Sequence, residues 1–343
     1  MKLKSVISAI LIFTLLLASA APAFAAVPGQ TSPAASADFG TNVKDFFQNL
    51  FNKIKARFLT VQYYFEVKKE RVPNTMNKNA IHMLRSVQDT ICDSFIITTE
   101  DGKVIVVDGG HNFETDYFIQ YLKAVTGQKT PKIDAWFLSH PHMDHVEVFN
   151  EVAENRANQV TFDKVLLHYV PYELYESRSE EEGMQMVGEF DRISKAFPEK
   201  VQILNSGDVF NIGKAKFTVL YTADESFIDV NDHSVVFRMD LGGKSVMFTG
   251  DAQVKAGNKA LAEWESSGLI DCDICKMAHH GQNGVDRNFY EAVSPEICLW
   301  PTPSWVWDNV NGNLQTLEVR GWIDELGVKE NYVAKDGSHV LYL

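Results

Sequence analysis

The chain has 343 residues, of which 45% are hydrophobic and 22% are charged, and its formal net charge is −13 at neutral pH. This composition is ordinary for a globular protein and argues against a disordered chain, and the length allows a sizeable buried core. The excess of acidic residues repels polyanions at long range, so nucleic acid is disfavoured as a partner unless a local basic patch overrides the repulsion.

The first 25 residues predict a secretory signal peptide. Two lysines precede an apolar run at residues 6–17, and residues 23–25 have the A-x-A pattern of a cleavage site. The run is shorter than the ~20 apolar residues of a membrane-spanning helix, so we expect no transmembrane segment in the mature chain. The mature protein is therefore expected to be secreted or extracytoplasmic.

Residues 26–40 are rich in Ala, Pro, Ser and Gly and contain little to bury, which predicts a flexible leader. Thr41 or Asn42 can then cap a helix, and residues 41–79 are interpreted as this helix with a connector. The apolar residues of the helix have the spacing of one helical face: Val43, Phe46, Phe47, Leu50, Phe51, Ile54 and Phe58. We expect this face to dock on the main domain; binding to a membrane surface or a partner is the alternative.

From residue 80 the sequence changes to short β-type runs bounded by turn residues. The first half predicts strands at 81–87, 94–99, 104–107 and 135–138, with a helix at 115–125. The second half predicts strands at 216–221, 234–240, 245–249, 274–278 and 297–300, with helices at 254–266 and 317–326. Strands mixed with helices in two similar halves predict one layered α/β domain over residues 80–343.

The strongest chemical signal follows the strand predicted at 135–138. Three histidines and an aspartate lie within six residues there: His140, His142, Asp144 and His145. Neutral imidazole and carboxylate are ligands that zinc and similar divalent ions prefer. In an extended segment His140 and His142 point to the same side and can share one ion. If the chain then turns, Asp144 and His145 face a second ion, so the cluster predicts two adjacent metal ions.

Two further groups at the ends of predicted strands supply candidate ligands from distant sequence. Asp251 ends an apolar strand in the run Thr249-Gly250-Asp251, where its carboxylate can bridge two ions. His279 and His280 follow the strand predicted at 274–278. Adjacent residues of a strand point in opposite directions, so we expect one histidine to bind metal and the other to contact substrate or support a ligand. His280 is the preferred ligand.

In this order the motifs resemble those of the metallo-β-lactamase superfamily: Val107-Asp108-Gly109-Gly110, His140-x-His142-x-Asp144-His145, Thr249-Gly250-Asp251 and His279-His280-Gly281. The resemblance covers residues 80–343 and implies an αββα sandwich with the metals at its edge. Within the superfamily, the segments 231–234 (Asn-Asp-His-Ser) and 276–280 (Lys-Met-Ala-His-His) are similar to two branches. These are the domain of competence DNA-channel proteins and the secreted phosphorylcholine esterases that act on cell-wall teichoic acid.

Two departures from the superfamily pattern concern the first ion and a loop near the substrate. Many members supply another histidine between the first cluster and the Gly-Asp pair, whereas only His168 and His233 lie in that interval here. His168 is a candidate ligand, and His233 a candidate substrate contact. The V-G-x-G-D motif that usually opens such a domain is degraded at residues 87–91, which puts substrate handling by this loop in doubt.

The resemblance implies a hydrolase that uses two divalent metal ions, with zinc the expected metal. A water that bridges two such ions is acidified from a pKa of ~16 towards ~7 and supplies hydroxide for attack. We assign catalytic roles to Asp144 and His280, and the free member of the histidine pair could donate a hydrogen bond to the developing charge. No serine or cysteine nucleophile is required.

The substrate class depends on the tryptophan-rich segment at residues 300–307. Trp307 is interpreted as a substrate contact, because a tryptophan face can bind a quaternary ammonium; packing is the alternative. With export and the acidic charge, this favours a small-molecule or cell-wall phosphodiester that carries a cationic group. The other hypotheses are an extracellular metal-dependent nuclease, as the competence-domain resemblance suggests, and a non-catalytic binding module.

Overall fold

The structure is a computed structural model that describes residues 33–343. The chain divides into two units, one ending at Glu66 and one starting at Val67. The predicted signal peptide (1–25) and residues 26–32 of the predicted leader lie outside the described residues. Within the part of the chain that the structure describes, no helix is both long enough and apolar enough to cross a membrane.

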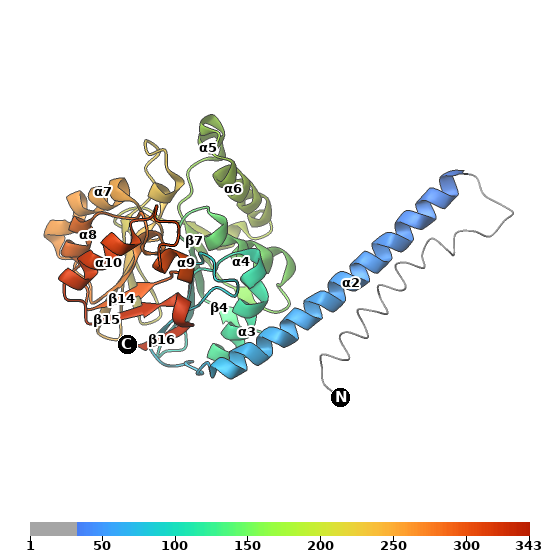
Figure 1. Cartoon of the computed structure of the whole chain (residues 1–343), viewed down its shortest axis with the longest axis horizontal. Helices are drawn as coiled ribbons and strands as arrows, with labels where there is room; N and C mark the ends of the chain where they lie inside the picture. Colours follow the sequence, from blue (N-terminus) through green and yellow to red (C-terminus); the bar gives the residue numbers. More distant parts are fainter. Residues whose placement is uncertain (1–32) are drawn as a thin grey trace. The chain divides into compact units, whose positions relative to one another are not determined.

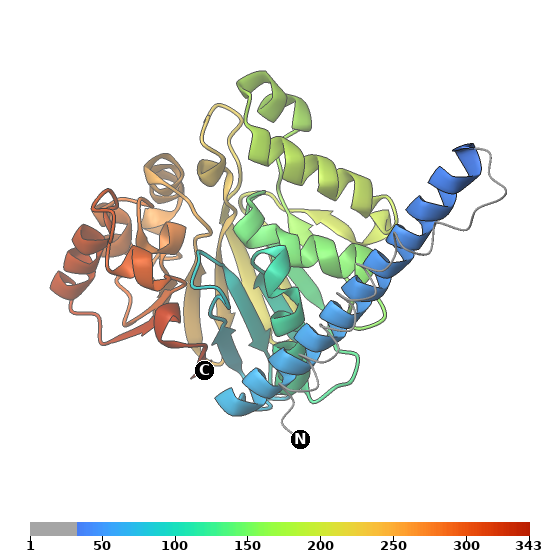
Figure 2. The ribbon, with the colours of Figure 1, turned by 45° about the vertical axis from the view of Figure 1, so that its right-hand side comes forward.

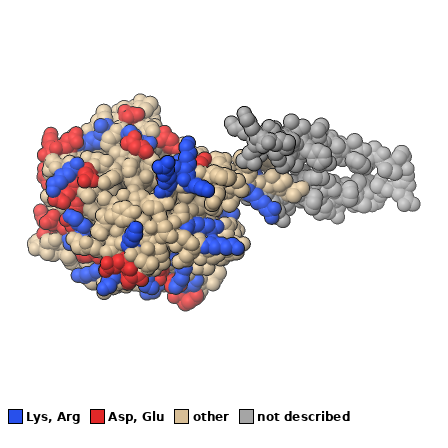
Figure 3. All heavy atoms as spheres, turned by 90° about the horizontal axis from the view of Figure 1, so that it is seen from below, with Lys and Arg blue, Asp and Glu red and all other residues tan. Residues whose placement is uncertain are grey.

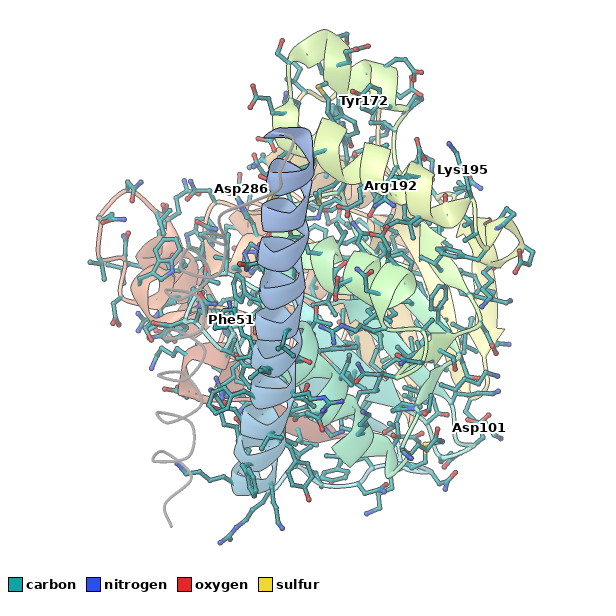
Figure 4. All side chains as sticks on the ribbon, turned by 90° about the vertical axis from the view of Figure 1, so that its right-hand side faces the viewer. Phe51, Asp101, Tyr172, Arg192, Lys195 and Asp286 are labelled. Atoms are coloured by element: carbon teal, nitrogen blue, oxygen red, sulfur yellow. The ribbon has the colours of Figure 1, made fainter. Side chains whose placement is uncertain are left out.

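Helix α2 (Pro33–Glu70) begins earlier than the start that the sequence predicted at Thr41 or Asn42. Residues 33–40 are therefore helical in the structure, where the sequence predicted a leader. Proline is tolerated at the first position of a helix, where its missing N–H would have no partner, and the alanines that follow favour helix. Docking of the predicted apolar face stays a prediction; four of its side chains, including Phe51 (Figure 4), are 36–40% exposed: Leu50, Phe51, Ile54 and Phe58.

Two seven-stranded sheets form the second unit, and each is antiparallel in one half and parallel in the other. The first sheet has the order β16 (His339–Tyr342), β1 (Ala80–Met83), β2 (Ser94–Thr98), β3 (Val104–Asp108), β5 (Ala135–Leu138), β7 (Val165–Leu167) and β8 (Val201–Ile203). The second has the order β15 (Glu330–Val333), β14 (Ile297–Trp300), β13 (Ile274–Lys276), β12 (Lys244–Phe248), β11 (Val236–Leu241), β10 (Ala215–Tyr221) and β9 (Val209–Ile212). A small sheet pairs β4 (Lys132–Ile133) with β6 (Thr161–Phe162).

Helices cover the outer faces of both sheets (Figures 1 and 2). On the first sheet, Trp136 of β5 packs against Phe118 of α3 and Phe149 of α4. A second apolar cluster joins the outer face of the other sheet to α7, α8 and α10. The predicted αββα sandwich is confirmed. Its helices are α3 (Thr115–Thr126), α4 (Met143–Asn155), α5 (Tyr172–Arg178), α6 (Glu181–Ser194), α7 (Val254–Trp264), α8 (Arg287–Val293), α9 (Ser304–Trp307) and α10 (Thr316–Glu325).

The core lies between the two sheets and is rich in phenylalanine. Phe137 of β5 stacks on Phe237 of β11 with ring centroids 4.6 Å apart, and Phe217 of β10 lies 4.9 Å from Phe137. Strands β2, β3 and β5 are buried along their whole length, as strands covered on both faces must be. This packing fixes the strand ends at one edge, from which the loops carrying the predicted ligands emerge.

Candidate metal centre

The predicted histidine cluster lies where strand β5 gives way to helix α4. His140 follows the strand, and His142 has extended backbone angles (φ −104°, ψ 152°) as the residue before the helix. Nε2 of His140 and Nδ1 of His142 are 3.0 Å apart, so the two rings face a common point. Asp144 and His145 lie in the first turn of α4. The start of this helix provides the turn that the sequence predicted between the two pairs.

Four of the predicted ligands converge from three segments of the chain. Asp144 and His145 come from α4, Asp251 from the loop after β12, and His280 from the 3-10 turn η6 (Ala278–Gly281). One donor atom from each of these residues lies within 4.8 Å of all the others, and all four residues are buried. The fold therefore assembles one group of ligands from both sheets of the sandwich.

Hydrogen bonds determine which nitrogen of each imidazole faces this group. Nδ1 of His145 donates to Asp108 Oδ2 at 2.9 Å, and Nδ1 of His280 donates to the carbonyl oxygen of Pro301 at 3.1 Å. In the neutral rings the Nε2 atoms are therefore lone-pair acceptors. They face another acceptor, because Asp251 Oδ2 lies 3.2 Å from Nε2 of His145 and 3.1 Å from Nε2 of His280.

These contacts have the arrangement of metal ligands. Asp144 Oδ2, His145 Nε2 and His280 Nε2 are buried, yet none has a hydrogen-bond partner among the residues that the structure describes. Buried polar atoms are normally paired, and acceptors that face one another at these distances repel unless a cation lies between them. Two imidazoles and two carboxylates are a donor set that suits zinc and related ions. The residues present therefore fit a divalent metal ion.

A buried lysine orients Asp251. Nζ of Lys276 donates to the carbonyl oxygen of Gly250 at 2.5 Å and to Asp251 Oδ1 at 3.3 Å. Consequently Oδ2 alone faces the imidazoles. Lys276 also pairs with Asp93, and the side chains of both residues are at most 2% exposed.

The sequence did not identify Asp93 as a site residue. It precedes strand β2, whereas the motif was expected at residues 87–91. Asp89 from that loop instead accepts a hydrogen bond from the backbone of Ser304 at 2.8 Å. The signal that could have identified Asp93 is its place directly before an apolar strand, where a carboxylate can be carried into the interior.

Around His145 and His280 there are more buried carboxylates than buried lysine side chains. Burial favours neutral imidazole, but Asp251 and Asp144 outweigh it, so the pKa of His145 lies well above its usual value and that of His280 rises to about 10. Burial also raises the pKa of the Asp251 carboxyl, yet His145, His280 and Lys276 hold it well below its usual value. The cluster has an excess of negative charge that protons or divalent cations must balance. Its buried carboxylates are Asp93, Asp108, Asp144 and Asp251.

The His279-His280 pair lies in η6 and not in a strand. Both residues have left-handed backbone angles (φ 49° and 54°), so the strand alternation on which the prediction rested does not apply. The preference for His280 agrees with its place in the buried group. His279 lies at the edge, with its side chain 19% exposed and Nε2 4.0 Å from Asp251 Oδ2.

His279 is better suited to accept than to donate. Its Nδ1 donates to the carbonyl oxygen of Asn283 at 3.0 Å, which leaves Nε2 as the acceptor of the neutral ring. Burial lowers the pKa of this histidine, so the neutral form is favoured. The predicted donation of a hydrogen bond to substrate is therefore not supported, and Nε2 can bind a metal ion or take up a proton.

The two histidines predicted between the main motifs do not join the ligand group. His233 is buried, and its ring nitrogens contact the Tyr175 hydroxyl and the Phe227 carbonyl oxygen, each at 3.0 Å. Both nitrogens are paired inside the protein, so this structure leaves neither open for the substrate contact that we predicted. Nδ1 of His168 donates to the carbonyl oxygen of Leu204 at 2.6 Å, and the ring lies outside the candidate ligand groups.

Trp307 packs within the protein. The guanidinium of Arg320 lies over its ring, 4.0 Å from the centroid, and Trp300 contacts it edge to face at 5.3 Å. A cation of the protein itself thus takes the position that we predicted for a quaternary ammonium. The packing alternative accounts for Trp307.

A pocket of about 380 Å³ is lined by two residues that adjoin site residues. Its wall includes Pro301, which holds His280, and Cys92, which precedes Asp93. Two cationic residues, Arg85 and Lys335, also line it, and each is paired with a carboxylate, Glu70 and Asp336 respectively. The pocket is therefore polar and does not present an aromatic cage.

Known proteins that resemble this chain indicate the family to which it belongs. A model described as "Metallo-beta-lactamase superfamily" matches residues 87–293. ComE operon protein 3 of Bacillus subtilis is 22% identical over 177 residues, which make up 51% of this chain and 20% of that protein. The chain therefore spans about a fifth of the length of this relative.

Several solved structures are also similar. The metallo-beta-lactamase fold protein YhfI from Bacillus subtilis has 14% identity and a TM-score of 0.46, with 76% of this chain and 99% of that chain covered. CmlA, a diiron beta-hydroxylase from Streptomyces venezuelae, has 13% identity and a TM-score of 0.49, with 78% and 54% covered. MEM-A1, a subclass B3 metallo-beta-lactamase from a soil metagenome library, has 15% identity and a TM-score of 0.39, with 75% and 92% covered.

Proposed function

The chain belongs to the metallo-β-lactamase superfamily and is a metal-dependent hydrolase. We propose that it is an exported two-metal phosphodiesterase. The observation that carries the proposal is the buried group of Asp144, His145, Asp251 and His280 beside the facing rings of His140 and His142. Export rests on the signal peptide predicted at residues 1–25. Small-molecule or cell-wall phosphodiesters are the proposed substrates.

Two adjacent divalent ions, with zinc the first candidate, would act as Lewis acids on a phosphoryl group and lower the pKa of a shared water towards ~7. His140 and His142 would hold one ion, and Asp144, His145 and His280 the other. Asp251 would contribute Oδ2 to the centre, because Lys276 holds its Oδ1 and Oδ2 faces His280.

The protein's own residues account for the remaining steps. Asp108 holds His145 through Nδ1, so that Nε2 faces Asp251 and would be available to a metal ion. His279 borders the exposed side, where its Nε2 can take the proton of an attacking water. The burial of the ligands excludes bulk water and strengthens every charge interaction in the centre.

Support for a choline group in the substrate is weaker than support for the phosphodiester. Arg320 lies over Trp307, and the polar pocket carries Arg85 and Lys335 and no aromatic face. On the face of the molecule in Figure 3, basic and acidic side chains are interspersed. The phosphorylcholine-esterase-like specificity therefore rests on the sequence resemblance alone.

Hydrolysis of three substrates in parallel tests the proposal: bis-p-nitrophenyl phosphate, p-nitrophenyl phosphorylcholine and DNA. Protein reconstituted with zinc, manganese or iron should release p-nitrophenol from at least one diester, and the Asp251→Asn variant should not. Protein that holds two ions but hydrolyses no phosphodiester would refute the proposal.

A metal-dependent nuclease is the second candidate. It is favoured by the likeness to ComE operon protein 3 and by the resemblance to the domain of competence DNA-channel proteins. The acidic net charge of −13 opposes it. Metal-dependent DNA cleavage with no release from either p-nitrophenyl diester would decide for the nuclease.

A further inference from the structure

The ion assigned to His140 and His142 has fewer ligands in the sequence motifs than the other ion of the proposed pair. His140 and His142 supply two imidazoles, and the histidine that many superfamily members add has no equivalent here. His168 is held by Leu204, and both ring nitrogens of His233 are paired. A further protein ligand of its own, beside the shared Asp251, must come from a residue that no motif marks.

Glu182 lies at this position. It is in the first turn of helix α6, and one of its carboxylate oxygens lies within 4.8 Å of donor atoms from both His142 and Asp144. We propose that Glu182 is a further protein ligand, beside the shared Asp251, of the ion held by His140 and His142. This inference rests on the proposed two-metal function and assigns a ligand within that site.

A backbone hydrogen bond holds the carboxylate of Glu182 beside His142. Oε1 accepts a hydrogen bond from the backbone N–H of Met143 at 2.8 Å, and Met143 directly follows His142. Oε2 has no hydrogen-bond or ion-pair partner among residues 33–343. A half-buried carboxylate fixed in this way has little freedom left to lose on binding an ion.

Two further contacts fix the position of α6 against α4. Asn150 donates a hydrogen bond to Glu189 at 3.2 Å, and Arg192 (Figure 4) donates one to Glu154 at 3.0 Å. With the Met143 contact, these pairs advance in the same direction along both helices. Glu182 therefore reaches the cluster from a helix that is tied down along its length, and not from a free loop.

Charge and chemistry also favour a carboxylate here. His140 and His142 are neutral ligands, so without Glu182 only the shared carboxylate of Asp251 would compensate the charge of their ion. Carboxylate oxygen is a good partner for zinc, manganese and iron, and mixed histidine and carboxylate sets are common for these ions. Glu182 supplies a negative charge beside His142.

The test compares Glu182→Gln with Glu181→Gln, a matched change at an exposed glutamate of the same turn. In Glu182→Gln the side-chain amide oxygen can still accept the hydrogen bond from Met143, so folding and the metal-free unfolding midpoint should not change. Metal content after dialysis and competition with a chromophoric chelator give the readout. We expect the wild type and Glu181→Gln to hold two zinc ions. Glu182→Gln should hold one tightly and the other at least about tenfold more weakly.

A Glu182→His variant extends the test, because imidazole would restore the ligand that many superfamily members use. Recovery of the weak ion in this variant supports the proposal. Two ions bound with wild-type affinity in Glu182→Gln would overturn it and leave the two-metal function standing. Fewer than two ions in the wild type itself would overturn the proposed function first, and the role of Glu182 with it.

Discussion

The buried cluster around His82 and the buried cluster around His145 and His280 differ in the groups that face the imidazole nitrogens. His82 on β1 is fully buried, with Nε2 2.8 Å from the Thr75 hydroxyl and Nδ1 3.3 Å from the Tyr121 hydroxyl. Thr98 donates in turn to Thr75 at 2.9 Å. Every partner is neutral, and burial lowers the pKa of His82 to about 3. This cluster is complete without a ligand.

His145 and His280 are buried to the same degree, but their Nε2 atoms face carboxylates without a hydrogen bond. The neighbouring charges raise the pKa of both rings, to about 10 for His280. Burial therefore does not separate a structural histidine from a metal ligand. The difference lies in whether its second nitrogen has a partner within the protein.

The largest effect is expected when the carboxylate of Asp251, which the two ions would share, is removed from the charged cluster. In Asp251→Asn, Oδ2 no longer carries the charge that two ions share, so we expect loss of at least one ion. Hydrolysis should fall about 10³-fold, equivalent to ~4 kcal/mol of transition-state stabilisation. Metal analysis and phosphodiester turnover measure this. Thr75→Val, the matched change in the neutral cluster, should leave both quantities unaltered, and equal losses in the two variants would invalidate the distinction.

A lysine within the charged cluster allows a second test, through stability. Lys276→Met leaves the buried carboxylate of Asp93 without its cation, which should cost about 3–5 kcal/mol in the free energy of unfolding. Adding Asp93→Asn removes one of the two carboxylates that Lys276 contacts, so the double variant should recover part of the loss. Urea unfolding of the metal-free proteins provides the measurement. A double variant as unstable as Lys276→Met would show that the lysine acts through some other contact.

Local patterns explain why much of this fold and site could be predicted. Strand β5 was predicted at its observed bounds because four apolar residues end at a polar cluster. His140, His142, Asp144 and His145 are close in sequence, so their spacing alone indicates shared ions. The αββα layers followed from the resemblance that these motifs carry.

The remaining site residues depend on tertiary contacts that leave no local pattern. Glu182 follows two other glutamates on a helix that has the composition of a solvated surface, and only its packing against α4 carries it to His142. The left-handed turn at His279 and His280 breaks the strand that the apolar run predicted. Asp93 and Lys276 are a pair only because β2 and β13 belong to facing sheets.

The neutral cluster around His82 can be tested through the pH dependence of the free energy of unfolding. The pKa of His82, about 3 in the folded state, lies below the ordinary value of 6.5, so between these values the unfolded chain binds more protons. Its contribution to stability is therefore complete above pH 6.5 and is lost as the pH falls, by about 2 kcal/mol at pH 5. Unfolding of the wild type and His82→Asn at pH 7 and pH 5 measures the difference. A variant with the same pH slope as the wild type would contradict the assignment.

The smallest effect is expected at His233, which extends the comparison to a third buried histidine. Tyr175→Phe removes the hydroxyl that pairs with His233 Nδ1 and should cost about 1 kcal/mol in the free energy of unfolding. Because the ring has no role towards substrate in this structure, KM and metal content should stay at wild-type values. Thermal unfolding and steady-state kinetics on one preparation separate the two effects. A several-fold rise in KM with unchanged stability would restore His233 as a substrate contact and show that a paired histidine can still serve the site.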